Sequence, residues 1–195
     1  MNLTVIKLGG SLMRSTELSY WLENIESVSL HSNVVIVPGG GEFADLVRNT
    51  QKERQFDDYV AHQMALLAMC QYGYLLNGMN KKLRIIEDMA LFPSYFGKNL
   101  PLLWIPMSLI NNDSDIAANW DFTSDSISLW LATKLCATRL VLVKSKVLNK
   151  TTTRNHIKNG DLDKGFQELS SSYSGEILFF EKKQYEQFHE FNFND

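Results

Sequence analysis

The stretch VVIVPGGGEFADLVR, residues 34–48, decides the expected fold, because an apolar run leads directly into three glycines and then a helical pattern. A short run of β-branched residues is typical of a strand in a parallel sheet that is covered on both faces. The pattern after the glycines places Phe43, Leu46 and Val47 on one side of a helix. A strand, a glycine turn and a helix in this order predict one unit of an α/β protein.

The same alternation extends along the whole chain. Strands are expected at residues 3–8, 33–38, 83–86, 102–105, 139–144 and 176–180. Helices are expected at residues 16–28, 41–51, 57–78, 123–137, 161–169 and 181–191. This order predicts a three-layer α/β/α sandwich with a mainly parallel open sheet, and 195 residues suit a single domain.

Composition narrows the function classes. The formal net charge is −3, which argues against a domain that binds nucleic acid through a basic surface. The longest apolar stretch, LPLLWIPMSLI at 100–110, contains two prolines and is too short to cross a membrane. Cys70 and Cys136 both fall in helical apolar patterns, where burial is expected, and two such thiols suit a reducing compartment. We therefore expect a cytoplasmic protein with neither nucleic acid nor membrane as partner.

Two glycine turns follow expected strands, one at Gly9, Gly10 and Ser11 and the other at Gly39, Gly40 and Gly41. Ligands of open α/β sheets bind beyond the carboxyl ends of the strands. Glycine lets the backbone approach a ligand closely, and the start of a following helix attracts anions. Two such turns predict two anion sites, an arrangement that suits phosphate transfer to an anionic acceptor.

A dinucleotide-binding site is the main alternative, because Gly39, Gly41 and Ala44 satisfy the pattern G-x-G-x-x-[GA]. That fold needs an acidic residue at the end of a second strand about 20 residues further on. The nearest acids, Asp57 and Asp58, begin an expected helix instead. An NAD-dependent oxidoreductase would also leave the first glycine turn without a role.

Lys7 and Asp125 are the candidate catalytic residues. Lys7 stands in an apolar strand two residues before a glycine turn, where an ammonium would neutralise charge during phosphoryl transfer. Its structural alternative is an edge lysine that extends to solvent. Asp125 falls in the first turn of an expected helix, among side-chain donors from Thr123, Ser124 and Ser126. It is expected either to orient lysines or to interact with the helix dipole.

Three motifs in this order resemble the amino acid kinase family: VIKLGGSL at 5–12, VIVPGGGEFAD at 35–45 and TSDS at 123–126. The resemblance covers roughly residues 3–148 and implies an ATP-dependent small-molecule kinase, with Mg²⁺ accompanying ATP. It places the acceptor mainly within residues 1–122, the nucleotide mainly within 123–195, and implies a homo-oligomer. The residues that it assigns to the nucleotide or its phosphates are Gly9, Gly10, Ser11, Ser124, Lys144 and Lys146. The glycines 39, 40 and 41 would lie on the acceptor side, and no protein side chain is expected to bind metal.

A narrower resemblance is carried by FADLVR at 43–48 and WDFTSDSISLWLA at 120–132. These segments are similar to the small archaeal and methylotroph branch that phosphorylates (5-(aminomethyl)furan-3-yl)methyl phosphate in methanofuran biosynthesis. Such an acceptor needs a cation for its phosphate, which Arg48 would supply, and an acid for its ammonium. Asp45 or Asp121 is expected to be that acid, and His62 to line the same pocket. Their structural alternatives are a solvated helix face for Arg48 and Asp45 and a packing role for His62.

Two motifs of the family are absent. The usual D-x-D-G-[VI] after the nucleotide strand is replaced by KSKVLNK at 144–150, and no GGM-x-x-K occurs late in the chain. The identity of a second catalytic lysine, the contacts to adenine and the retention of activity therefore stay open. The alternatives to the furan kinase are a non-catalytic nucleotide-binding or regulatory member and a kinase for isopentenyl phosphate or UMP.

Overall fold

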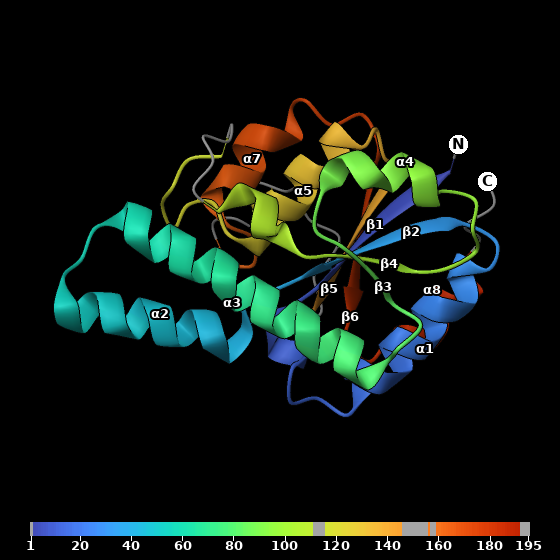
Figure 1. Ribbon diagram of the computed structural model, residues 1–195, viewed down its shortest axis with the longest axis horizontal. Coiled ribbons are helices and arrows are strands. Elements are labelled where there is room, and N and C mark those ends of the chain that lie inside the picture. Colours follow the sequence, from blue (N-terminus) through green and yellow to red (C-terminus); the bar gives the residue numbers. More distant parts are fainter. Residues whose placement is uncertain (1, 111–115, 146–155, 157–158, 192–195) are drawn as a thin grey trace.

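The computed structural model describes residues 2–110, 116–145, 156 and 159–191, which form a layered α/β structure (Figure 1). One sheet contains six strands in the order β3-β4-β2-β1-β5-β6, and every pairing is parallel. The strands are β1 Leu3–Leu8, β2 Asn33–Pro38, β3 Arg84–Ile86, β4 Leu102–Trp104, β5 Arg139–Lys144 and β6 Glu176–Glu181. The expected sandwich with a parallel sheet is confirmed.

All the expected helices are present, with ends shifted by a few residues. They are α1 Glu17–Ser29, α2 Gly41–Arg54, α3 Asp58–Met79, α5 Ser124–Lys134, α7 Lys164–Ser170 and α8 Tyr185–Glu190. Four further short elements have too few residues to show a periodic pattern: η1 Gly10–Leu12, η2 Met89–Leu91, α4 Phe92–Tyr95 and η3 Pro106–Leu109. No helix in the described ranges is long and apolar enough to span a membrane.

Each central strand contributes side chains to two separate hydrophobic cores, because successive side chains of a strand point to opposite faces of the sheet. On β1, Leu3 and Val5 pack in the cluster that includes α5 and α7. Ile6 and Leu8 pack in the other cluster, with α1 and α8. The two pairs of helices accordingly lie on opposite sides of the sheet (Figure 1). By the same alternation, Lys7 is on the face that α5 covers.

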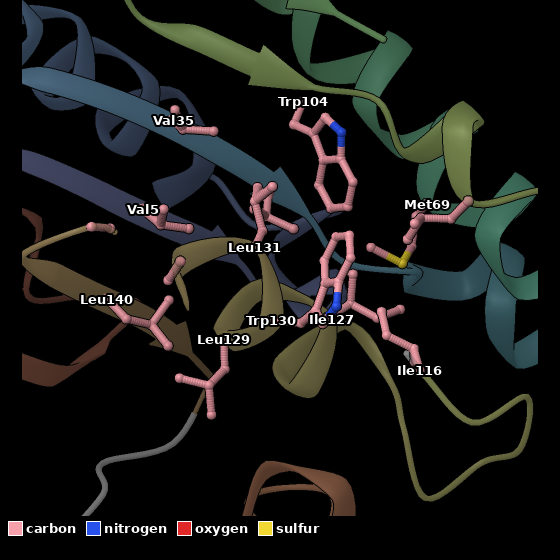
Figure 2. Close-up of a cluster of buried hydrophobic side chains, with 14 of the residues drawn as sticks. Val5, Val35, Met69, Trp104, Ile116, Ile127, Leu129, Trp130, Leu131 and Leu140 are labelled. Atoms are coloured by element: carbon pink, nitrogen blue, oxygen red, sulfur yellow. The ribbon is translucent and has the colours of Figure 1, made fainter. Parts of the chain in front are cut away.

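Helix α5 is a core helix, and its residues from Asp125 to Ala132 are buried. It packs against β1 and β5 on one side and α7 on the other. Leu129 and Leu131 are fully buried, and the Trp130 ring lies 6.3 Å from the Trp104 ring, centroid to centroid (Figure 2). Ser126 and Ser128 are buried in the same stretch, and the Ser128 hydroxyl donates to the Asp125 carbonyl over 2.7 Å. Burial of α5 fixes the position of its first turn, which carries Asp125.

Two local expectations are wrong. Helix α5 ends at Lys134, and Cys136 beyond it is exposed, with a left-handed φ of 50°, so it is not a buried helical thiol. The first glycine turn does not lead into a full helix either. It enters the 3₁₀ turn η1, and α1 begins only at Glu17, so the helix-start contribution expected there is limited to one short turn.

Candidate functional site

The two glycine turns pack directly on each other. Because β1 and β2 are parallel neighbours, the turns leave the sheet side by side, and the Gly39 amide donates to the Leu8 carbonyl over 2.9 Å. A Cβ on Gly10 would lie 2.2 Å from the Gly41 nitrogen, and one on Gly39 would lie 2.6 Å from the Gly10 nitrogen. Glycine is therefore required at these positions so that two backbones can touch. The contact brings both expected anion sites to one place.

Lys7, Asp125 and Lys144 form a buried ion cluster at the carboxyl ends of β1 and β5. The Lys7 ammonium lies 2.8 Å from Asp125 Oδ1, and the Lys144 ammonium pairs with Oδ2 of the same carboxylate. The side chains of Lys7, Asp125 and Lys144 are 6%, 8% and 16% exposed, respectively. Two ammoniums share one carboxylate, so the cluster carries one surplus positive charge.

The two ammoniums keep the Asp125 carboxylate ionised. Burial by itself would raise the pKa of Asp125, but the charges of Lys7 and Lys144 outweigh burial and hold the pKa below its ordinary value of 3.8. Burial lowers the pKa of Lys144, and the neighbouring charge of Lys7 lowers it further, against the opposing effects of Asp125 and Asp163. A buried surplus charge of this kind is stabilised when an anion binds beside it.

The Lys7 ammonium acts on the Asp125 carboxylate chiefly through its charge. Within the described residues, Asp125 Oδ1 accepts no hydrogen bond, although Lys7 is at ion-pair distance from it. The Lys7 nitrogen also lies 3.6 Å from the position that a Cβ on Gly9 would take. Lys7 is thus held beneath the first glycine turn by charge, with hydrogen-bond capacity left for another acceptor.

Asp163 is a part of the site that the sequence did not reveal. Its carboxylate accepts hydrogen bonds from the Thr123 amide at 2.8 Å, the Thr123 hydroxyl at 2.6 Å, the Ser126 amide at 3.2 Å and the Ser126 hydroxyl. It also accepts from the Phe166 amide at 3.0 Å and so caps α7. Thr123 and Ser126 are adjacent to Asp125 in the sequence, but their hydroxyls donate to Asp163.

The segment that contains Asp163 also holds the second lysine. The Lys144 ammonium donates to the backbone carbonyl of Asp161 over 2.8 Å. Residues 161–163 thus hydrogen-bond both to Lys144 and to the first turn of α5, which carries Asp125. The only sequence signal for this contact is an aspartate three residues before Phe166, the spacing of an ordinary N-cap.

A cavity of about 450 Å³ opens beside the glycine turns, between α2, α3 and residues 119–124. This volume suits a small-molecule ligand. Eight of the expected site residues line it: Gly10, Ser11, Gly40, Gly41, Asp45, Arg48, His62 and Ser124. Apolar side chains complete one wall, among them Leu66, Met69, Phe122 and Ile127. Burial lowers the pKa of His62, so this imidazole is neutral near physiological pH.

The remaining expected residues lie elsewhere. Asp121 does not line the cavity, because its carboxylate pairs with the Lys164 ammonium at 2.9 Å on the surface. Lys7, Asp125 and Lys144 lie beside the cavity, beneath the glycine turns, rather than in its lining. Gly9 and Gly39 do not line the cavity either, and their amides donate to the carbonyls of Val143 and Leu8. Lys146 lies outside the described residues.

Metal ligands are the last candidates to place. Among the residues that the structure describes, no three His, Cys, Asp or Glu side chains are grouped so that they would hold a metal ion.

Comparison with known proteins bears out the resemblance. Residues 2–87 match the profile of the amino acid kinase family. The chain is 28% identical over 147 residues to [5-(aminomethyl)furan-3-yl]methyl phosphate kinase of Methanocaldococcus jannaschii. That match covers 73% of this chain and 65% of the relative, which is slightly less than two thirds of its length.

Solved structures share the fold. UMP kinase from Ureaplasma parvum superimposes with a TM-score of 0.66 at 16% identity, covering 92% of this chain and 89% of that one. Uridylate kinase from Archaeoglobus fulgidus gives 0.65 at 15% identity, covering 94% and 93%. An isopentenyl phosphate kinase gives 0.62 at 13% identity, covering 96% and 95%. The chain therefore shares the fold of these three kinases.

A methyl group at Gly10 tests the contact between the glycine turns. We predict that Gly10→Ala lowers the free energy of unfolding by about 1–3 kcal/mol, because the added carbon meets backbone atoms that have no room to move. The matched control is Gly78→Ala on α3, where no atom lies within 4 Å of the new carbon. It should be neutral or stabilising by up to about 1 kcal/mol. Equal losses in urea titrations of both variants would contradict the contact.

The acid dependence of stability tests the ion cluster. The native pKa of Asp125 is depressed, so its contribution to stability is complete above the ordinary value of 3.8 and is lost as pH falls through the native value. We predict that Asp125→Asn is less stable than wild type by about 3–5 kcal/mol near neutral pH, and that this gap shrinks on acidification. Asp121→Asn, at the exposed pair, should change stability by less than about 1 kcal/mol. A gap that stays constant with pH would show that Asp125 is not ionised in the native state.

Proposed function

We propose that this chain is an ATP-dependent kinase that transfers a phosphoryl group to a small phosphate monoester and releases a diphosphate. The observation that carries the proposal is the buried cluster of Lys7, Asp125 and Lys144 directly beneath two touching glycine turns. Its surplus positive charge lies where two strand ends open toward a ligand-sized cavity. Such an arrangement stabilises negative charge that builds up between a donor and an acceptor phosphate.

In the proposed reaction, an oxygen of the acceptor phosphate attacks the γ-phosphorus of ATP, and the bond to the β-phosphate oxygen breaks as ADP leaves. Catalysis consists of positioning and charge stabilisation, with no covalent enzyme intermediate. Lys7 and Lys144 contact the transferring group, and Asp125 keeps the two ammoniums close together against their mutual repulsion. Mg²⁺ accompanies ATP and is held by phosphate oxygens and water.

The backbone of the glycine turns supplies further donors. The first amides of α2, beginning at Gly41, have no acceptor within their own helix, and those of Gly10 and Ser11 stand at the same edge. In the proposed complex these amides bind phosphate oxygens, those of Gly10 and Ser11 on the donor side and those of Gly40 and Gly41 on the acceptor side. Lys146 remains a proposed second contact to the nucleotide.

The acceptor that the observations favour is [5-(aminomethyl)furan-3-yl]methyl phosphate. The M. jannaschii relative is a kinase of this compound, and the cavity offers a partner for each of its parts. Arg48 would bind the phosphate, the apolar wall the ring, and Asp45 the ammonium. Of the two acids that the sequence predicts for the ammonium, Asp45 lines the cavity, whereas Asp121 is engaged with Lys164. The neutral His62 would donate one further hydrogen bond in the same wall.

We also propose that the chain acts as a single domain and as a homo-oligomer. Several large apolar side chains on one helix, α3, are exposed, which supports a self-association surface. They are Tyr59, Val60, Leu67, Tyr74, Leu75 and Met79.

A second candidate is a nucleotide-binding module without kinase activity, favoured by the two absent family motifs. Release of ADP from ATP should therefore be measured against a panel of acceptors: the furan phosphate, isopentenyl phosphate and UMP. We predict turnover that depends on a phosphate acceptor and is fastest with the furan phosphate. Turnover with another member of the panel alone would overturn the acceptor. Binding of ATP by calorimetry, with no turnover on any acceptor, would favour the non-catalytic module.

Removal of one cluster lysine should abolish that turnover. We predict that Lys7→Ala lowers kcat by roughly 10²–10³-fold or more while the protein stays folded. The matched control is Lys82→Ala, an exposed lysine paired with Glu26 away from the cavity, which should keep its activity. Wild-type kcat in folded Lys7→Ala would remove Lys7 from the mechanism.

A further inference from the structure

The cavity wall contains an immobilised tryptophan, Trp120, whose role the proposed function does not require. Its indole nitrogen donates to Gln51 Oε1 over 2.6 Å. The amide nitrogen of Gln51 in turn donates to Asp58 Oδ1 at 2.8 Å and to the Phe56 carbonyl at 3.2 Å. These partners fix which way the Gln51 amide points, so the indole is tied to both α2 and the start of α3.

Arg48 rests on the same indole. Its guanidinium carbon lies 4.5 Å from the centroid of the Trp120 ring, within the range of a cation–π contact. In the part of the chain that the structure describes, Arg48 forms no ion pair. The contact therefore positions the guanidinium while leaving its hydrogen-bond donors available to an anion.

The position of Trp120 along the chain connects the wall to the cluster. Trp120, Phe122 and Ser124 all line the cavity, and Asp125 follows immediately in the first turn of α5. A phosphate held by Arg48 would have whatever is attached to it beside the aromatic surface of Trp120. The part of the acceptor nearest its phosphate is thus the part that this wall contacts.

We propose that the Trp120 indole, held by Gln51 and Arg48, selects acceptors in which a flat unsaturated ring is joined to the phosphate through a short link. The inference rests on the proposed function, since it assumes that the cavity binds the acceptor phosphate. A flat ring gains contact over its whole face when it stacks on an indole or a guanidinium. A flexible branched chain of similar size gains less, so the wall discriminates by shape and not by charge.

Two substitutions of Trp120 distinguish the effect of its aromatic face from the effect of its hydrogen bond to Gln51. Trp120→Leu removes the aromatic face, whereas Trp120→Phe keeps a ring and loses the bond to Gln51. We predict that Trp120→Leu raises the KM for the furan phosphate about tenfold, with Trp120→Phe in between. The KM for ATP and the kinetics with isopentenyl phosphate should change less than about twofold. The ratio of kcat/KM for the furan phosphate to kcat/KM for isopentenyl phosphate, here called the ring-to-chain ratio, therefore falls. The matched control is Tyr20→Leu, an exposed aromatic residue of α1 that does not line the cavity.

The outcomes separate this inference from the proposed function. An unchanged ring-to-chain ratio in Trp120→Leu, or an equal rise in the KM for ATP, would overturn the inference and leave the kinase standing. Calorimetric binding of the furan phosphate that is weakened about tenfold in Trp120→Leu, without turnover in wild type, would support the inference and overturn the kinase. Absence of both binding and turnover would overturn both. If Trp120→Leu does not fold, Gln51→Leu, which frees the indole, should also raise the KM for the ring acceptor.

Discussion

One carboxylate shared by two buried ammoniums is the interaction on which the rest of this structure depends. Lys7, Asp125 and Lys144 come from positions far apart in the sequence, and each is placed by a different element. The alternation of β1 turns Lys7 toward α5, burial of α5 fixes Asp125, and the parallel pairing of β5 with β1 places Lys144 beside them. A buried cluster with unequal charges is costly. The Asp161 carbonyl and the charge of Asp163 offset part of this cost at Lys144.

The supporting contacts all act on this cluster. Asp163 caps the start of α5 and of α7 at once, and the neighbouring Asp161 carbonyl accepts from Lys144. The glycine turns above it touch through backbone atoms, which brings amides from two strands over the same surplus charge. The positive charge of the cluster and the backbone amides of the glycine turns together form a site that suits phosphate groups. The adjacent cavity suits the rest of the acceptor molecule.

Local sequence patterns were sufficient to predict the strands, the long helices and the residues that follow the strand ends. Lys7 was identifiable because it interrupts an apolar strand, and the alternation of that strand already placed it on one face. Asp125 was identifiable because a helix start with several hydroxyls is distinctive. The predictions of strands and helices are confirmed because they depend on neighbours within a few residues of each other.

The sequence did not predict contacts whose partner is distant along the chain. Thr123 and Ser126 donate to Asp163, about 40 residues away, and not to the adjacent Asp125. Asp121 is drawn to Lys164 on the surface, and the stack of Arg48 on Trp120 joins α2 to a loop far along the chain. The hydrophobic periodicity of a sequence carries no information about side-chain contacts between residues that are far apart in the chain. The prediction that Cys136 is buried in a helix was wrong for a local reason: α5 ends before Cys136, which adopts a left-handed backbone conformation.

The most direct test of the proposed activity is to observe the product. Wild-type protein, ATP, Mg²⁺ and [5-(aminomethyl)furan-3-yl]methyl phosphate would be followed by phosphorus NMR. A phosphoryl transfer supported by the Lys7–Asp125–Lys144 cluster predicts that the single acceptor resonance is replaced by two coupled diphosphate resonances as ADP accumulates in equal amount. An acceptor resonance that persists while ATP is unchanged, or while ATP is converted only to ADP and free phosphate, would contradict it.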